Sequence, residues 1–117
     1  MVIEKWTADG SDDTFSFRIS PGALTTSIST SGGIGKSSKI SVAPNVTYTV
    51  AEELFPAQKA AGWGAFDITC NNQPVDEDGN PFYSTFENGL SGLAMRANTT
   101  TTCLFLNSQT NLVIVKN

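Results

Sequence analysis

Three polar residues in this sequence occupy positions where the strand pattern calls for buried apolar side chains. They are Lys5, Glu52 and Asn107. Each follows an apolar residue of the same short run by two positions: Ile3, Val50 and Phe105, in turn. Because side chains in a β-strand alternate between its two faces, residues two apart point the same way. The pattern therefore predicts a lysine, a glutamate and an asparagine at the ends of three core-facing rows.

These three side chains could form a covalent bond within the folded chain. Removal from water lowers the pKa of a lysine amine and raises that of a carboxyl group, because burial disfavours the charged form of each. A neutral Lys5 amine could then attack the side-chain amide carbon of Asn107, while a protonated Glu52 shuttles protons. Ammonia would leave, and an amide would join Lys5 to Asn107. The fixed positions of the groups in a folded core would supply most of the rate.

Each of the three residues also has an ordinary structural explanation. Lys5 could extend to solvent from an edge strand, and Glu52 could begin a solvated loop. Asn107 could be a turn residue before a linker. A second acid, Glu53, directly follows Glu52. Strand parity places Glu53 on the face away from Val50, which favours Glu52 as the reactive acid, but a β-bulge would exchange the two.

The elements that must position these residues are short strands. Clusters of turn-forming residues recur at short intervals, for example ADGSDD (8–13), SGGIG (31–35) and DEDGNP (76–81). Short strands between regularly spaced turns are typical of an all-β sandwich or barrel. Residues 52–63 could hold a short helical turn before Gly62. The expected strands are 2–6, 13–19, 24–29, 37–42, 46–53, 64–71, 82–86, 92–97, 100–107 and 112–116.

Composition limits the classes of function. The 117 residues fit one globular domain, with 39% hydrophobic and 15% charged residues. The net charge of −4 argues against nucleic acid or an anionic membrane as a partner. No run approaches the roughly 20 apolar residues of a membrane helix. Met1 leads directly into an expected strand and not into a signal peptide. If the parent protein is secreted, we therefore expect this sequence to be a mature or excised piece of it.

The chain contains no histidine, the commonest metal ligand and general base. We therefore expect no metal site, no cofactor and no turnover of an external substrate. The two cysteines, Cys70 and Cys103, each lie in a run with a strand pattern, and two cysteines alone cannot complete a structural zinc site. Their setting favours a disulfide between strands. The alternative is two buried reduced thiols that pack as small hydrophobic side chains.

The end of the sequence resembles its beginning. Ile3 and Lys5 recur as Ile114 and Lys116 at the same spacing. A strand that recurs after a linker indicates a tandem array, in which the final strand begins the next repeat. Alternatively, this strand completes the domain's own sheet, or residues 112–116 pair with the sheet of another subunit. The expected boundaries are 1–107 for the domain, 108–111 for the linker and 112–117 for the final strand.

The chain resembles the collagen-adhesin B-type, or SpaA-type, domains of bacterial surface proteins, which have a prealbumin-like fold. The segment AAGW (60–63) resembles the P-x-G-[YW] motif of these domains, although a longer segment than usual follows Pro56. The segments ITC (68–70) and TCLFLN (102–107) resemble the cysteine-bearing branch of the family. The resemblance rests chiefly on VIEKW (2–6) as the lysine strand, DTFSFRI (13–19) as the second strand, YTVAE (48–52) as the Y-x-[LV]-x-E box and TTCLFLN (101–107) as the closing strand.

The resemblance implies an all-β, immunoglobulin-like or prealbumin-like sandwich with Greek-key-type connections and an internal isopeptide bond. Lys5 would be the nucleophile, Asn107 the electrophile and Glu52 the acid and base. The implied function is that of a structural repeat in an extracellular adhesin, pilus or stalk protein at the cell surface. Its partners would be neighbouring repeats, and the isopeptide bond and a disulfide would stabilise it.

Two alternatives share this fold. The domain could bind a host or surface ligand through the Ser/Thr-rich loops at 25–38 and 99–102. It could also be a subunit that polymerises through residues 112–116. Neither alternative involves nucleic acid, membrane insertion or an enzymatic reaction on an external substrate.

Overall fold

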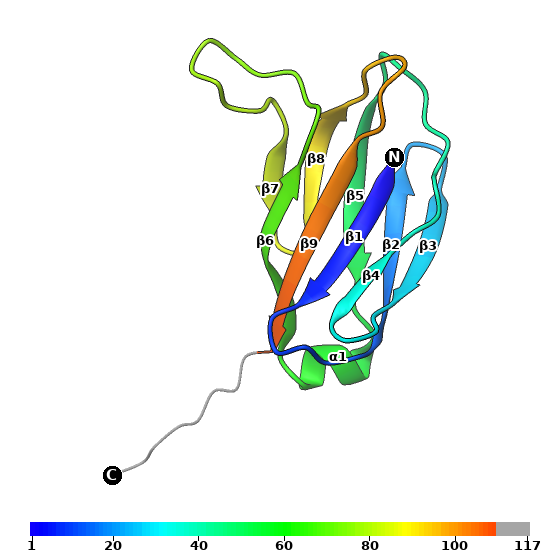
Figure 1. Cartoon of the computed structure of the whole chain (residues 1–117), viewed down its shortest axis with the longest axis vertical. Helices are drawn as coiled ribbons and strands as arrows, with labels where there is room; N and C mark the ends of the chain where they lie inside the picture. Colours follow the sequence, from blue (N-terminus) through cyan, green and yellow to red (C-terminus); the bar gives the residue numbers. More distant parts are fainter. Residues whose placement is uncertain (110–117) are drawn as a thin grey trace.

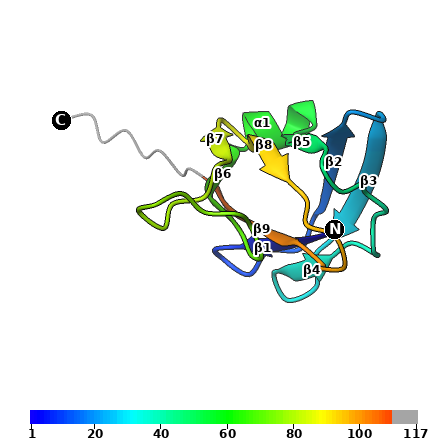
Figure 2. The same cartoon turned by 90° about the horizontal axis from the view of Figure 1, so that it is seen from above.

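Alternating apolar and polar residues along the chain build two β-sheets that pack face to face (Figures 1 and 2). The computed structural model describes residues 1–109. The all-β sandwich predicted from the sequence is confirmed. The strands are β1 (Val2–Thr7), β2 (Thr14–Ser20), β3 (Leu24–Ser29), β4 (Ile34–Lys36), β5 (Thr47–Glu53), β6 (Trp63–Cys70), β7 (Ser84–Phe86), β8 (Gly89–Ala94) and β9 (Thr102–Gln109).

The two sheets differ in strand number and order. The first has four strands in the order β4-β1-β9-β6, and the second has five in the order β3-β2-β5-β8-β7. Because side chains alternate along each strand, successive residues point in turn toward the other sheet and toward the outside. In β2 this alternation buries Phe15, Phe17 and Ile19 between the sheets. Phe17 meets Phe105 of the opposite sheet edge to face, with ring centroids 4.9 Å apart, a favourable geometry for aromatic pairs.

The first and last described strands are neighbours and run in the same direction (Figure 1). Their register pairs Lys5 with Phe105 and Thr7 with Asn107. Because β4 borders β1 on its other side, Lys5 lies on an interior strand of the sheet. The explanation of Lys5 as an edge lysine that extends to solvent is therefore wrong.

The strand expected at 37–42 does not form, and the edge strand of the first sheet is β4, which ends at Lys36. Ser37 donates its N–H to the carbonyl of Ile3 and accepts the N–H of Ile3 on its own hydroxyl. The next backbone bond runs from Ile40 to Met1. The segment thus advances three residues while β1 advances two, and the Ser37 hydroxyl takes the place of a backbone carbonyl, so no regular ladder continues.

The helical turn expected before Gly62 is present as α1 (Pro56–Ala60). Proline is favoured at the start of a helix because its fixed φ suits the first turn. Gln58 attaches the helix to β2, because its Nε2 donates to the carbonyl of Thr14 at 2.8 Å. Its Oε1 accepts the N–H of Phe55 at 2.9 Å. Gly62, with φ +83°, follows the helix in the left-handed conformation that ends many helices.

The expected linker and final strand fall mostly beyond the described part of the chain. β9 continues to Gln109 and so includes the first residues of the expected linker at 108–111. The strand expected at 112–117, and with it the proposed pairing of 112–116, lies outside the described residues. Among residues 1–109, no helix has the length and apolar character needed to cross a membrane.

Candidate functional site

The structure brings Lys5, Glu52 and Asn107 together between the two sheets. Lys5 and Asn107 are fully buried, and Glu52 is 6% exposed. Oε2 of Glu52 lies 3.4 Å from Nζ of Lys5. Nδ2 of Asn107 donates a hydrogen bond of 2.5 Å to Oε1 of the same carboxyl group. The Glu52 carboxyl group, from the second sheet, therefore contacts both the amine and the amide, which come from neighbouring strands of the first sheet.

The Lys5 amine is enclosed mainly by aromatic rings and backbone carbonyls. Its Nζ lies 4.4 Å from the centre of the Phe15 ring, and Trp63 packs edge to face on that ring with centroids 5.6 Å apart. The carbonyls of Phe105 and Trp6 accept long hydrogen bonds from Nζ, at 3.4 and 3.5 Å. These contacts hold the amine in place without supplying strong hydrogen bonds that would favour its charged form.

Phe15 is a site residue that the sequence reasoning did not single out. The signal was present in the segment TFSFRIS, where alternation places Phe15 on the same face as Phe17 and Ile19. What alternation alone does not give is the partner across the core. Phe15 covers Lys5 only because β2 packs over β1 in the folded sandwich.

Burial shifts the pKa values of the two charged groups in opposite directions. Removal from water lowers the pKa of Lys5 to about 8. The negative charge of Glu52 and the hydrogen bond between Lys5 and Glu52 oppose this shift. Burial also raises the pKa of Glu52, against the opposing effects of Lys5 and the hydrogen bond from Asn107. The ion pair and the neutral pair of amine and carboxylic acid hold the same number of protons. Transfer of one proton between the two groups therefore produces the nucleophilic amine without exchange with solvent.

The neighbouring acid, Glu53, points to the outside of the sandwich. Its carboxylate accepts a hydrogen bond from Nε of Arg18, and both side chains are about half exposed. The register shift in β5 lies between Tyr48 and Val50, before the two glutamates, so it does not exchange their faces. The orientation inferred from strand parity agrees with this arrangement. The role of Glu52 in proton transfer stays a prediction.

Two buried side-chain oxygen atoms of the site, alone among residues 1–109, accept no hydrogen bond of regular geometry: Oδ1 of Asn107 and Oε2 of Glu52. Oε2 still faces the Lys5 amine at 3.4 Å, so Oδ1 of Asn107 is the atom without a partner. A buried polar atom without a partner costs about 1–3 kcal/mol, and each such atom calls for an explanation. A proton on the Glu52 carboxyl group would supply a donor for the amide oxygen of Asn107. That contact would polarise the carbonyl that an attacking amine must reach.

A surface cleft lies beside the site, although the side chains of Lys5 and Glu52 are themselves fully buried. Glu52 forms part of the wall of a surface cleft together with Lys59, Trp63 and Asn88. Lys5 and Asn107 are not among the residues that line this cleft. A small molecule released at the amide could reach water by passing the Glu52 carboxyl group.

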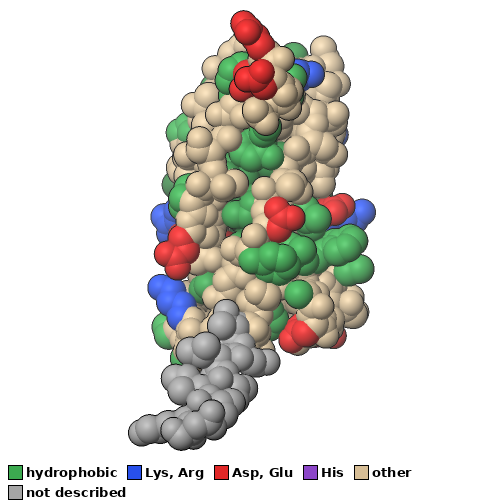
Figure 3. Space-filling view, turned by 90° about the vertical axis from the view of Figure 1, so that its left-hand side faces the viewer, with side chains coloured by type: hydrophobic (Ala, Val, Ile, Leu, Met, Phe, Trp, Pro, Cys, Tyr) green, Lys and Arg blue, Asp and Glu red, His purple; other side chains and the backbone are tan. Residues whose placement is uncertain are grey.

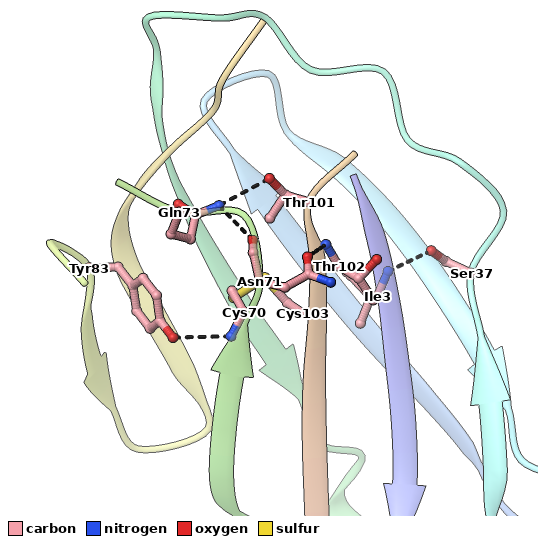
Figure 4. The surroundings of a disulfide bond; sticks show 9 residues. All are labelled: Ile3, Ser37, Cys70, Asn71, Gln73, Tyr83, Thr101, Thr102 and Cys103. Atoms are coloured by element: carbon pink, nitrogen blue, oxygen red, sulfur yellow. Dashed lines mark hydrogen bonds between the residues drawn. A yellow bond between two sulfur atoms is a disulfide. The ribbon is translucent and has the colours of Figure 1, made fainter. Parts of the chain in front are cut away.

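The disulfide joins neighbouring strands near the other end of the sandwich (Figure 4). Cys70 of β6 and Cys103 of β9 are register partners, and a disulfide bond connects them. The prediction of an inter-strand disulfide is thereby confirmed, and the alternative of two reduced thiols is not. Tyr83 accepts the N–H of Cys70 at 3.0 Å, and Asn71 accepts the N–H of Thr102 at 2.8 Å. Two side chains thus support the backbone on both sides of the bond.

Comparison with known proteins bears on the whole described part of the chain. The family model of the SpaA-type prealbumin-like fold domain matches residues 1–109. The match includes Lys5, Glu52 and Asn107 as well as both cysteines. No curated protein and no solved structure gives a significant match.

Proposed function

The chain belongs to the SpaA-type prealbumin-like fold domains, and from this premise we propose that it is a structural repeat of an extracellular adhesin, pilus or stalk protein. Domains of this family are structural and generally belong to surface proteins. We further propose that a self-formed isopeptide bond between Lys5 and Asn107 locks the domain. The observation that carries this proposal is the Glu52 carboxyl group in contact with both the Lys5 amine and the Asn107 amide.

The proposed reaction is an amide exchange. Proton transfer from Lys5 to Glu52 frees the amine, which attacks Cγ of Asn107. The Nζ–Cγ bond forms while Glu52 gives its proton to the amide oxygen. Glu52 then takes the surplus proton from Nζ and passes it to Nδ2. The Cγ–Nδ2 bond breaks, ammonia leaves, and the proton on the oxygen returns to Glu52 as the new amide carbonyl forms. Neither oxidant nor co-reactant is required, because a Cγ–Nζ bond replaces the Cγ–Nδ2 bond and no atom changes its oxidation state.

The enclosure of the site supports this chemistry. A low-polarity surrounding lowers the cost of the neutral amine and of the neutral acid at the same time. Because the folded sandwich holds the reactants in contact, most of the entropic cost of bringing them together is met by folding. The cleft beside Glu52 gives ammonia a path to solvent, which makes the reaction effectively irreversible.

The bond would join β1 and β9, which are neighbours in the sheet although they are the first and last strands of the described sequence. Lys5 lies on β1 and Asn107 on β9, and the disulfide between Cys70 and Cys103 lies inside the loop that they would close. A chain closed in this way cannot be fully extended by pulling or threaded into a protease. Such resistance suits a repeat that transmits load between neighbouring repeats on a cell surface.

Intact mass under denaturing conditions tests the bond directly. The unmodified chain should lack about 17 Da, one ammonia, after reduction of the disulfide. The Glu52→Gln variant should regain this mass because it cannot supply the acid proton. The matched control is Glu53→Gln, which alters the next carboxyl group on the outer face and should keep the deficit.

Failure of the bond would be plain in the same spectra. A deficit of only about 2 Da that disappears on reduction would mean that the disulfide is the sole cross-link. The isopeptide proposal would then be abandoned. The alternative of a ligand-binding module of the same fold would take first place.

The rate of bond formation should follow a bell-shaped pH profile. Below the raised pKa of Glu52 both groups are protonated, and Lys5 is then a cation that cannot attack. Above the pKa of Lys5, about 8, the pair has lost its shared proton, and Glu52 is no longer an acid. The maximum should therefore lie between the two values. The measurement dilutes a chain kept unfolded since synthesis into buffers of increasing pH and follows the loss of about 17 Da over time. A rate that keeps rising through pH 10 or so would contradict a role of Glu52 as acid.

One observation favours the binding alternative, though at another surface than expected. Three of the exposed phenylalanines belong to β6, to β7 or to the segment just before β7, on a side of the molecule where hydrophobic side chains gather (Figure 3), and none of them lies in the loops 25–38 and 99–102. They are Phe66, Phe82 and Phe86, with exposed fractions of 60%, 63% and 46%. A ligand of this domain would therefore be sought along the β6–β7 side. Polymerisation through residues 112–116 is the third candidate, and a molecular mass in solution that rises with concentration would support it.

A further inference from the structure

Asn88, in the turn between β7 and β8, connects the two sheets next to the candidate site. Its backbone carbonyl accepts the N–H of Glu52 at 2.8 Å. Its side-chain Oδ1 accepts the N–H of Ala65 at 2.9 Å. Glu52 belongs to the second sheet and Ala65 to the first. A single residue thus forms hydrogen bonds to both layers of the sandwich.

The two residues that Asn88 binds are the ones that place the acid and the amide. Glu52 is itself the proposed acid. Ala65, on β6, is the register partner of Asn107 on β9. Two hydrogen bonds of Asn88, together with the pairing of β6 with β9, therefore link Glu52 to Asn107. The separation between the Glu52 backbone and the strand of Asn107 depends on the geometry of Asn88.

The local conformation suits this connection. Asn88 has φ +62°, in the left-handed region that asparagine and glycine adopt most readily. Gly89 follows it, and a Cβ there would lie 2.7 Å from the carbonyl oxygen of Val50. The absence of a side chain at Gly89 allows the turn to approach β5 closely enough for the Asn88 carbonyl to reach Glu52.

We propose that Asn88 is a positioning residue for the isopeptide reaction, which holds the Glu52 carboxyl group against the Asn107 amide. This inference rests on the function proposed above. Asn88 touches none of the reacting atoms, so it acts only through the placement of Glu52 and Asn107. The Asn88 side chain bonds to the backbone of the opposite sheet. Such a hydrogen bond fixes the distance between the Glu52 carboxyl group and the Asn107 amide more narrowly than the packing of flexible side chains would.

The test compares the rate of bond formation in variants that keep the turn. Asn88→Gly removes the side-chain acceptor, but glycine adopts the same positive φ without strain. Asn88→Asp keeps an oxygen at the acceptor position and should restore most of the rate. The matched control is Asn98→Gly, which makes the same change at another asparagine of left-handed conformation, with φ +61°. Each chain, kept unfolded since synthesis, is diluted into refolding buffer, and intact mass and tryptophan fluorescence are followed in parallel.

We expect Asn88→Gly to fold and to lose ammonia about 10- to 100-fold more slowly than the unmodified chain. Asn98→Gly should react at the unmodified rate. If Asn88 served stability alone, Asn88→Gly would melt at a lower temperature but react at an unchanged rate once folded, and the proposal would be overturned. If the unmodified chain itself lost no ammonia, the proposed function would fail and this inference with it. Should Asn88→Gly not fold, Asn88→Ser, whose side chain is too short to reach Ala65, takes its place in the comparison with Asn88→Asp.

Discussion

Replacing Lys5 with methionine should lower the free energy of unfolding by about 4–5 kcal/mol and leave the sandwich intact. Methionine resembles the lysine stem in length and flexibility, so it fills the same space beside Phe15. Without the amine, no bond closes the loop of about 100 residues between β1 and β9, and the unfolded chain regains that conformational freedom. The intact disulfide changes this figure by only a few tenths of a kcal/mol, because loop entropy depends weakly on length.

Thermal unfolding of the oxidised proteins measures this difference. The midpoint should fall on the order of 20 °C for a domain of this size. Lys59→Met is the matched control, because Lys59 is exposed on α1 and its change should stay within about 0.5 kcal/mol. The unmodified chain is first shown by its mass to be cross-linked. If Lys5→Met were then equally stable, the bond would not stabilise the fold by restricting the unfolded chain, and the prediction would be wrong.

Strand parity correctly predicted that the side chains of the three candidate residues face the core. Lys5, Glu52 and Asn107 each continue a row of apolar residues two positions apart, and all three are buried in the fold. Parity also separated Glu52 from Glu53, because adjacent residues of a strand must face opposite sides. These are local properties of a strand. They hold whichever strands become neighbours, which is why a single sequence can reveal them.

Contacts between distant segments could not be predicted in the same way. The strand expected at 37–42 had the right alternation, but the Ser37 hydroxyl occupies the place of a backbone carbonyl beside Ile3 and interrupts the ladder. The sequence ENG at 87–89 indicated only a turn. That Asn88 reaches both Glu52 and Ala65 depends on how the second sheet folds over the first. Such a contact is decided by the packing of the sheets and not by local preference.

The parallel pairing of β1 and β9 leads to the second large effect, which concerns mechanical force. The chain enters β1 at one end of the sandwich and leaves β9 at the other (Figure 1). Force applied to the two ends of the described chain would therefore shear these neighbouring strands. With the bond in place, the load passes from Lys5 through the amide to Asn107. The segment between them carries no tension and cannot be drawn out.

Single-molecule pulling on the unmodified chain, held at its two ends, should therefore show no unfolding extension. Lys5→Met should lengthen by roughly 340 Å under reducing conditions, since about 100 residues extend by about 3.4 Å each. With the disulfide intact the extension should be shorter by roughly 110 Å, because the disulfide bridges a sequence separation of 33. Glu53→Gln should remain inextensible like the unmodified chain. An unmodified chain that lengthened as far as Lys5→Met would lack the covalent path between β1 and β9, and its strength would rest on hydrogen bonds alone.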